Sequence, residues 1–286
     1  MPPQPGKGSP DRPGLHGNPP ASADSRNDGL IASGFAVKSL IIPDIHNRVS
    51  IADQLISLAG PVDEIICLGD FWDDFYDTTI DARRTAGWVK GLKAVKLVGN
   101  HDLPYLFGEE HACPGYTLAK HRVIREVLTA AERWEFDLWA RRGSWLLTHG
   151  GLNSRMKNAW NPDAKLEHFS FAQSEATKEQ LAKGNHCPIV TNVSMMRGGL
   201  NAHAGILWCD WRELDVLPGI NQIVGHTPVP RFQFAQAGGN INVLLDTNTR
   251  NYGILHDSDE LEVFSATGNL EGRFRPGPGQ ATVFTP

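Results

Sequence analysis

The sequence SLIIPDIH occupies residues 39–46 and joins an apolar, strand-like run to an aspartate and a histidine that are two residues apart. Four further segments repeat this order of an apolar run followed by polar side chains at a turn. They are EIICLGDFWD at 64–73, VKLVGNHD at 95–102, WLLTHGG at 145–151 and INQIVGHT at 220–227. Polar groups that follow several strands of one sheet meet in a common crevice. The five segments therefore predict one polar site at the ends of neighbouring strands.

The composition favours a folded, cytoplasmic protein. The chain has 286 residues, of which 41% are hydrophobic, and this is enough for a sizeable core in one domain. The net charge of −5 provides no positive field that would attract nucleic acid or an anionic membrane. No apolar run approaches the roughly 20 residues that span a bilayer, and the N-terminus lacks the apolar core of a secretory signal. The four cysteines have no CxxC spacing and suit a reducing compartment, although a disulfide between distant cysteines stays open.

Composition also predicts three segments: an N-terminal tail, a folded domain and a C-terminal tail. Residues 1–34 are rich in Pro, Gly and Ser, and we expect a disordered N-terminal tail because such a segment buries too little apolar surface to offset its ordering entropy. The folded domain is expected over 35–267, followed by a Gly/Pro-rich C-terminal tail over 268–286. In the first half of the domain, helix-like apolar spacing at 50–59 and 78–92 alternates with β-rich runs. This alternation predicts a largely parallel inner sheet covered by helices.

The second half of the domain has a different pattern. Its expected elements are a hairpin within 134–148, a polar helix within 163–183, a long irregular loop over 184–205 and strands over 240–246 and 252–264. Long loops in compact domains are often functional, so the loop over 184–205 is a candidate for substrate contacts.

The polar side chains of the five segments form a typical metal-ligand set. The candidate ligands are Asp44, His46, Asp70, Asn100, His149 and His226. Mixed carboxylate, imidazole and amide ligands suit divalent ions of intermediate hardness, so manganese is our first choice, with iron, zinc, cobalt and nickel as alternatives. Six ligands exceed what one open catalytic metal uses, but they suit two ions about 3.5–4 Å apart that share a carboxylate. Asp70 is the natural bridge because it lies in the middle of the set.

A hydrolytic site of this kind also needs a proton donor for the leaving oxygen. His101 follows the candidate ligand Asn100 directly and can fill that role. The acidic side chain of Asp73 could orient the imidazole and keep it charged. We therefore predict His101 as the general acid and Asp73 as its supporting carboxylate.

The segments DIH, GDFWD, GNHD, HGG and GHT, in this order, resemble the calcineurin-like metallophosphoesterase superfamily over residues 44–227. The resemblance implies an α/β fold, a four-layer α/β/β/α sandwich with mixed central sheets, and a dinuclear site that hydrolyses phosphoesters by attack of a metal-activated water. The first metal would be held by Asp44, His46 and Asp70. The second metal would be held by Asp70, Asn100, His149 and His226.

Two departures refine this resemblance. Many members of the superfamily end in GHxH, but the last position here is Pro228, which is similar to the phage and bacterial serine/threonine phosphatases and the diadenosine tetraphosphatases. That branch has GDxxDRG, whose arginine grips the substrate phosphate, whereas Asp74 follows Asp73 in this chain. A replacement arginine would come from Arg48, Arg197 or Arg212, and Arg197 is our first choice because it lies in the long loop.

The expected function is hydrolysis of phosphomonoesters of the serine/threonine phosphatase type. The substrate would be a phosphoprotein, a nucleotide or a small phosphorylated molecule. Hydrolysis of dinucleoside polyphosphates and of phosphodiesters are the alternatives within the enzyme class. The alternative outside it is a non-catalytic scaffold, which is disfavoured because scaffolds of this kind usually lose metal ligands and none is missing here.

Overall fold

Two mixed β-sheets carry the five polar segments. The computed structural model describes residues 37–74, 76–278 and 281–284, so the tail expected over 1–34 lies outside the described residues. The seven-stranded sheet has the order β12-β11-β10-β9-β1-β2-β3, and the five-stranded sheet has the order β4-β5-β6-β8-β7. The strands of the first sheet are β1 (Lys38–Ile42), β2 (Glu64–Cys67), β3 (Val95–Lys96), β9 (Asn251–His256), β10 (Leu261–Ser265), β11 (Leu270–Arg275) and β12 (Thr282–Phe284). Those of the second are β4 (Ala140–Arg142), β5 (Trp145–Leu147), β6 (Asn221–Val224), β7 (Gln233–Ala237) and β8 (Asn240–Leu244).

Each sheet has a parallel part and an antiparallel part. The strands β1, β2 and β3 are parallel to one another, while β9 to β12 continue that sheet in antiparallel pairs. In the second sheet β5, β6 and β8 are parallel, and β4 and β7 are antiparallel edge strands. The carboxyl ends of six parallel strands are therefore available to present side chains.

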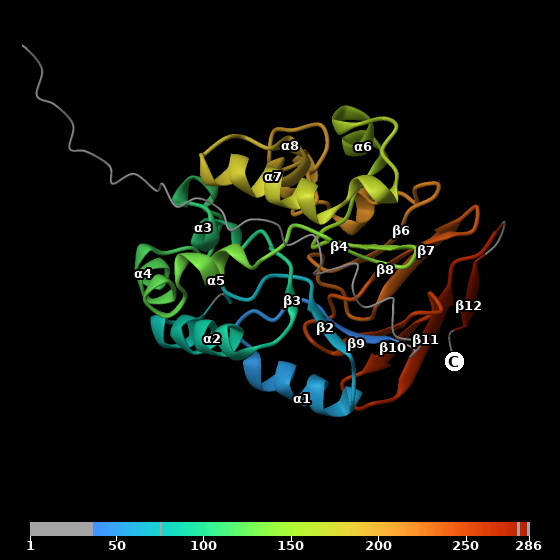
Figure 1. The fold of residues 1–286 in the computed structure, drawn as a ribbon, viewed down its shortest axis with the longest axis horizontal. Coiled ribbons are helices and arrows are strands. Elements are labelled where there is room, and N and C mark those ends of the chain that lie inside the picture. Colours follow the sequence, from blue (N-terminus) through green and yellow to red (C-terminus); the bar gives the residue numbers. More distant parts are fainter. Residues whose placement is uncertain (1–36, 75, 279–280, 285–286) are drawn as a thin grey trace, which may run out of the picture. The chain divides into compact units, whose positions relative to one another are not determined.

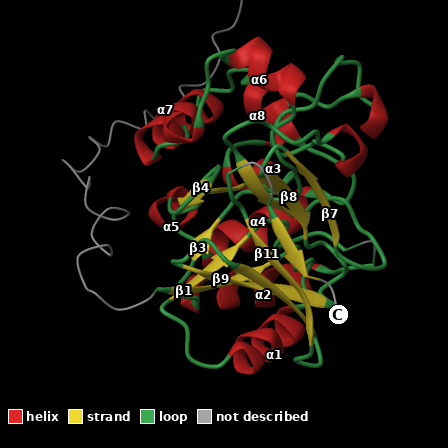
Figure 2. Cartoon of the chain, turned by 90° about the vertical axis from the view of Figure 1, so that its right-hand side faces the viewer, coloured by secondary structure: helices red, strands yellow, loops and turns green. Residues whose placement is uncertain are grey.

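Helices cover the sheets. They are α1 (Val49–Ala59), α2 (Thr79–Gly91), α3 (Leu103–Leu106), α4 (Leu118–Val127), α5 (Ala130–Trp134), α6 (Ser154–Trp160), α7 (Phe171–Ala182) and α8 (Pro188–Thr191), with short 3-10 turns at Glu109–His111, Leu166–His168, Met195–Arg197 and Trp211–Glu213. Figure 1 shows α1 and α2 on one side of the strands and α6, α7 and α8 on the other, and Figure 2 shows the strands between these two groups from the side. Among the described residues, none of the helices has both the length and the apolar content needed to cross a membrane.

The alternation of side chains along β1 explains the layers. Leu40 and Ile42 belong to the core that includes Ala52 and Leu55 of α1, so they face the helices. Ile41, between them, points to the opposite face, because successive strand residues alternate. The core on that face joins the two sheets; its members include Ile41, Ile66, Leu147, Ile223 and Val243. The predicted α/β/β/α fold with mixed central sheets is confirmed.

Local sequence also sets the helix boundaries. The side chain of Thr78 accepts a hydrogen bond from the backbone nitrogen of Asp81, and the Asp81 carboxylate accepts one from the backbone of Thr78. This reciprocal cap begins α2 and satisfies two backbone donors that the first turn leaves free. The helices expected over 50–59 and 78–92 thus appear as α1 and α2, with ends that differ by one residue.

The C-terminal segment differs from its expected form. Residues 268–286, predicted to be a Gly/Pro-rich tail, contribute β11 and β12 to the first sheet. β11 has the sequence LEGRFR, in which charged residues alternate with Leu270, Gly272 and Phe274, and the Phe274 side chain is fully buried. The local sequence does not predict this strand, because its inward positions include a glycine and its outward positions are charged. The loop over 184–205 also contains a short helix, α8, and a 3-10 turn.

Candidate metal centre

The candidate ligands follow the carboxyl ends of five parallel strands. Asp44 follows β1, Asp70 follows β2, Asn100 follows β3, His149 follows β5 and His226 follows β6. The first three strands belong to one sheet and the last two belong to the other. The site therefore lies where the two sheets meet at the same end of their strands, as expected for α/β folds.

One group of three candidate ligands consists of Asp44, His46 and Asp70. One ligand atom from each of these side chains lies within 4.8 Å of those of the other two. Nε2 of His46 is 3.6 Å from Oδ2 of Asp70. The opposite ring nitrogen, Nδ1, lies 2.7 Å from the backbone oxygen of Asp73, which accepts its proton and leaves Nε2 free to bind a cation.

A second group consists of Asp70, His149 and His226, again with ligand atoms within 4.8 Å of one another. Nε2 of His149 is 3.3 Å from Oδ2 of Asp70 and 3.2 Å from Nδ1 of His226. Asn100 joins this group, because its Oδ1 lies 2.9 Å from Nε2 of His149. Nδ1 of His149 lies 3.0 Å from the backbone oxygen of Leu68, so His149 is oriented in the same way as His46. Asp70 is the member that both groups share.

The backbone around these ligands is strained and tightly packed. His46, Asp70 and His226 have positive φ angles of 45°, 51° and 70°, a conformation that costs energy for residues other than glycine. Two glycines allow close approach to the carboxylates: a Cβ at Gly99 would lie 2.1 Å from Oδ1 of Asp70, and one at Gly225 would lie 2.1 Å from Oδ2 of Asp44. Strain of this kind persists where the surrounding structure fixes it, and it is typical of functional sites.

The two buried carboxylates have opposite electrostatic environments. Burial alone would raise the pKa of Asp70, but the nearby imidazoles of His149, His101 and His46 outweigh burial and hold that pKa well below its usual value. Burial raises the pKa of Asp44, and the negative charge of Asp246 raises it further. The backbone nitrogen of His226 donates to both oxygens of Asp44, at 2.9 and 3.1 Å. This hydrogen bond joins two loops that come from different sheets.

The pKa values of His149 and His226 are shifted in opposite directions. Burial would lower the pKa of His149, but the carboxylates of Asp70 and Asp44 raise it to about 9. Burial holds the pKa of His226 well below its usual value, and the neighbouring charges of His149 and Arg197 lower it further. His226 is thus neutral and able to offer a lone pair, which is the form that binds metals.

The donor set fits divalent metal ions. Nε2 of His226 is buried and has no hydrogen-bond partner among the described residues, although buried polar atoms are almost always paired. A cluster of two carboxylates, three imidazoles and an amide, nearly all buried, is costly without a cation that compensates the negative charge. Oxygen and imidazole ligands together suit ions such as manganese, iron and zinc. The described residues therefore offer two overlapping metal sites that share Asp70.

The predicted general acid lies at the edge of this cluster. Nδ1 of His101 is 3.5 Å from Oδ2 of Asp73, and the backbone nitrogen of His101 donates to Oδ1 of Asp70 at 2.9 Å. Burial would lower the pKa of His101, but the charge of Asp70 and the carboxylate of Asp73, 3.5 Å away, raise it to about 11. These neighbours favour the protonated imidazole, which is the form that a proton donor needs.

The Asp73 carboxylate also binds a buried lysine side chain. The ammonium of Lys120, on α4, donates to Oδ1 of Asp73 at 2.6 Å and to Oδ1 of Asp77 at 2.9 Å. The hydroxyl of Tyr105 also donates to Oδ1 of Asp73, at 2.6 Å. The other oxygen, Oδ2, is buried, lies 3.5 Å from Nδ1 of His101 and forms no hydrogen bond with the described residues. Asp73 is thus fixed on one side by Lys120 and Tyr105 and presents its second oxygen to the imidazole.

The guanidinium of Arg197 contacts the segment that carries the candidate ligand His226. Its Nη2 donates to the Thr227 hydroxyl at 2.8 Å and lies 3.4 Å from the backbone oxygen of His226. Its Nε is 3.0 Å from Oδ2 of Asp210, whose other oxygen pairs with Arg212 at 2.8 Å.

The other two arginines face outward or engage other groups. The Arg212 side chain is 66% exposed and contacts Asp210 rather than a candidate ligand. Arg48 lies 3.4 Å from Oδ1 of Asn248 and 3.6 Å from Oδ2 of Asp74. Arg197 therefore remains the first choice for binding phosphate.

Two carboxylates at the site were not predicted. Asp102 is fully buried and accepts hydrogen bonds at 2.8 Å from the backbone nitrogens of Phe71 and Gly99. It thereby joins the two loops that carry Asp70 and Asn100. Burial, with the charge of Asp70 second, raises the pKa of Asp102 to about 7.

Asp246 is the second overlooked carboxylate. It follows β8, the sixth parallel strand, and is 3% exposed. Burial raises its pKa. The signal that could have identified it is the same as for the candidate ligands: the strand-like run INVLL at 241–245 is followed directly by an aspartate.

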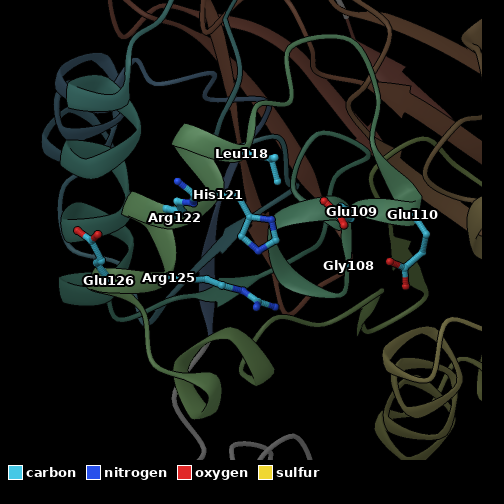
Figure 3. A pocket seen from close by; sticks show the side chains of 8 residues that line it. All are labelled: Gly108, Glu109, Glu110, Leu118, His121, Arg122, Arg125 and Glu126. Carbon is cyan, nitrogen blue, oxygen red and sulfur yellow. The ribbon is translucent and has the colours of Figure 1, made fainter. Parts of the chain in front are cut away.

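A pocket of about 610 Å³ lies elsewhere, between α4 and the turn at 108–111. Its lining residues are Gly108, Glu109, Glu110, Leu118, His121, Arg122, Arg125 and Glu126. Figure 3 shows the imidazole of His121 and the guanidinium of Arg125 in the space beside α4. None of the candidate ligands belongs to this lining, so the pocket is separate from the metal centre.

Some solved structures are similar to this chain in fold. Among solved structures, the cold-active protein-tyrosine phosphatase of a psychrophilic Shewanella species superposes with a TM-score of 0.51 at 13% identity, covering 82% of this chain and 80% of the other. A protein serine/threonine phosphatase from Saccharomyces cerevisiae with similarity to human phosphatase PP5 gives 0.44 at 16% identity, with 77% and 72% coverage. A putative diadenosine tetraphosphatase gives 0.42 at 15% identity, with 87% and 93% coverage.

A search of curated proteins gave no match. The sequence profile of the calcineurin-like phosphoesterases, in contrast, matches residues 37–230, which include every candidate metal ligand. The resemblance seen in the sequence is confirmed. This chain belongs to the calcineurin-like phosphoesterase family and is a metal-dependent phosphoester hydrolase.

Proposed function

We propose that this chain is a cytoplasmic phosphomonoesterase of the serine/threonine phosphatase type that works with two divalent metal ions, manganese first among them. The observation that supports this best is the position of Asp70 in both ligand groups. A carboxylate shared by two groups is the arrangement of a two-metal site. The free thiols of the described cysteines support a reducing compartment.

Eight residues would take part: six would bind the metals, and two would carry out the proton transfer. Asp44, His46 and Asp70 would hold one ion, while Asp70, Asn100, His149 and His226 would hold the other. Such ions, when bound, supply a water of lowered pKa and neutralise the charge of the phosphoryl oxygens. His101 donates its proton to the leaving oxygen, and Asp73 holds the imidazole in place through its Oδ2 atom.

Arg197 would bind the phosphate of the substrate. Its guanidinium lies beside the backbone of His226, so it can approach a phosphoryl group that is held at the second metal site. Planar guanidinium groups bind two phosphate oxygens at once, which suits this task. The chain would thereby replace the missing arginine of the GDxxDRG segment with one from a different loop.

The test is steady-state hydrolysis by protein reloaded with manganese. The substrates are p-nitrophenyl phosphate, bis-p-nitrophenyl phosphate, a phosphothreonine peptide and diadenosine tetraphosphate. We expect the two monoesters to be hydrolysed with the highest kcat/KM. A preference for the diester or for diadenosine tetraphosphate would instead support one of the two alternative activities, and protein that binds no metal and hydrolyses nothing would support a scaffold.

A further inference from the structure

Residues 193–201 form a small closed loop. The backbone nitrogen of Met195 donates to the oxygen of Asn201 at 3.2 Å, that of Asn201 donates to the oxygen of Val193 at 3.2 Å, and that of Gly199 donates to the oxygen of Ser194 at 2.8 Å. The Ser194 hydroxyl also donates to Glu213 at 2.6 Å and fixes the loop to the following turn. These bonds hold the backbone of the loop in one conformation.

This loop exposes three large apolar side chains, which we call the apolar tip: Met195, Met196 and Leu200. Their exposed fractions are 71%, 46% and 97%. Single exposed apolar residues are common, but three within six positions of one fixed loop are characteristic of a surface that contacts a partner. Methionine suits such a surface because its side chain is flexible and polarizable.

The loop that carries the apolar tip also contacts the backbone of a candidate metal ligand. Arg197 is part of the same loop, and its guanidinium turns inward to Thr227 and to the backbone of His226. The loop therefore presents one cationic side chain to the candidate metal site and three apolar side chains to solvent. A molecule whose phosphate reaches Arg197 brings its adjoining groups close to the apolar tip.

We propose that the apolar tip binds a large apolar side chain near the phosphorylated residue of a polypeptide substrate, and so selects among phosphorylated sequences. The proposal rests on the phosphomonoesterase function given above. The tip consists of thioether and aliphatic groups, and these match an apolar side chain of a polypeptide. Each residue of an extended peptide adds about 3.3–3.6 Å, so a residue a few positions from the phosphate can reach the tip.

The test uses phosphothreonine peptides that are otherwise Gly/Ser-rich and carry one leucine at each position in turn from three before to three after the phosphothreonine. The readout is the ratio of kcat/KM for each leucine peptide to that for the peptide without leucine, measured with the manganese-loaded enzyme. Because this is a ratio within one protein, a general loss of activity cancels. We expect at least one position to give a ratio of about 10, the scale of one well-buried apolar group.

The variant is the double substitution Met195→Gln and Leu200→Gln, which should reduce that ratio to about 1 or 2. The matched control is Leu118→Gln, which removes a leucine that is 55% exposed on α4, and it should keep the wild-type ratio. A flat profile for the wild-type enzyme, or an unchanged ratio in the double variant, would overturn the proposal. Hydrolysis of p-nitrophenyl phosphate by the wild-type enzyme is measured alongside: its absence would instead indicate that the proposed phosphomonoesterase function itself is wrong.

Discussion

Lys120 and Asp73 form an ion pair with 2.6 Å between Nζ and Oδ1, and both side chains are at most 5% exposed. A lysine is rarely buried to this extent without such a partner. The same ammonium also pairs with Asp77, so one positive charge compensates two buried carboxylates. This arrangement leads to a prediction about stability.

Lys120→Met should lower the free energy of unfolding by about 3–5 kcal/mol, because it removes the buried ammonium that Asp73 and Asp77 share. Urea unfolding of the metal-loaded protein measures this. The control is Lys90→Met, since Lys90 pairs with Glu132 but its side chain is 47% exposed, and such pairs contribute about 0–1 kcal/mol. Equal destabilisation by the two substitutions would show that the buried ion pair of Lys120 contributes no more to the free energy of unfolding than the exposed pair of Lys90.

Asp70→Asn should prevent the binding of two metals and abolish turnover, because the shared ligand loses its charge. Metal content per chain, measured by plasma mass spectrometry after reloading, gives the result directly. Asp53→Asn is the control, because Asp53 accepts a hydrogen bond from Trp88 on the helical side and contacts no candidate ligand. Two bound metals and normal rates in Asp70→Asn would refute the assignment of the site.

His101→Ala should retain both metals but lose rate by about 10²–10⁴, the usual contribution of general acid catalysis. The loss should be smaller for p-nitrophenyl phosphate than for a phosphothreonine peptide, because nitrophenolate leaves without protonation. The measurement is kcat for both substrates at saturating manganese. If the loss is the same for both leaving groups, His101 has a different role.

Arg197→Ala should raise KM for a phosphothreonine peptide by about 10-fold or more, since a charged hydrogen bond to a ligand contributes roughly 1.5–3 kcal/mol. Arg212→Ala is a close control. Both arginines pair with Asp210, but only Arg197 also approaches His226. A similar rise in KM for both variants would mean that the effect passes through Asp210 and not through contact with phosphate.

Gly99→Ala should disrupt the metal centre, because its Cβ would lie 2.1 Å from Oδ1 of Asp70 and 2.2 Å from the backbone nitrogen of that residue. We expect reduced metal content together with lower stability. Gly87→Ala, within α2, has nothing within 4 Å of the added Cβ and should leave metal content unchanged. Normal metal binding by Gly99→Ala would show that the loops around Asp70 can move apart.

The sequence alone predicts those parts of the molecule whose position in the fold follows from the local pattern of apolar and polar residues. A short apolar run such as Leu40 to Ile42 must be buried on both faces in a covered parallel strand, so the residues that follow it lie at the end of a sheet. The positions of Asp44 and Asp70 follow from this reasoning alone. The grouping of the ligands around Asp70 also follows, because it occupies the middle of the set.

Other features depend on contacts between distant residues. β11 and β12 are strands because they extend the sheet at β10, and their own composition is typical of a tail. Lys120 lies 47 positions from Asp73, and nothing in the local sequence distinguishes it from the exposed lysines of other helices. Asp102 appears in the sequence as a helix-capping residue, but its carboxylate instead accepts from Phe71 and Gly99.

The strand order has a consequence for the synthesis of this protein on the ribosome. Every candidate ligand lies between residues 44 and 226, yet β1 pairs with β9 and β6 pairs with β8, which are both translated later. A nascent chain that has just exposed His226 therefore carries the whole ligand set without the strands that hold it in place. We therefore expect metal to bind only after β8 and β9 have emerged from the exit tunnel.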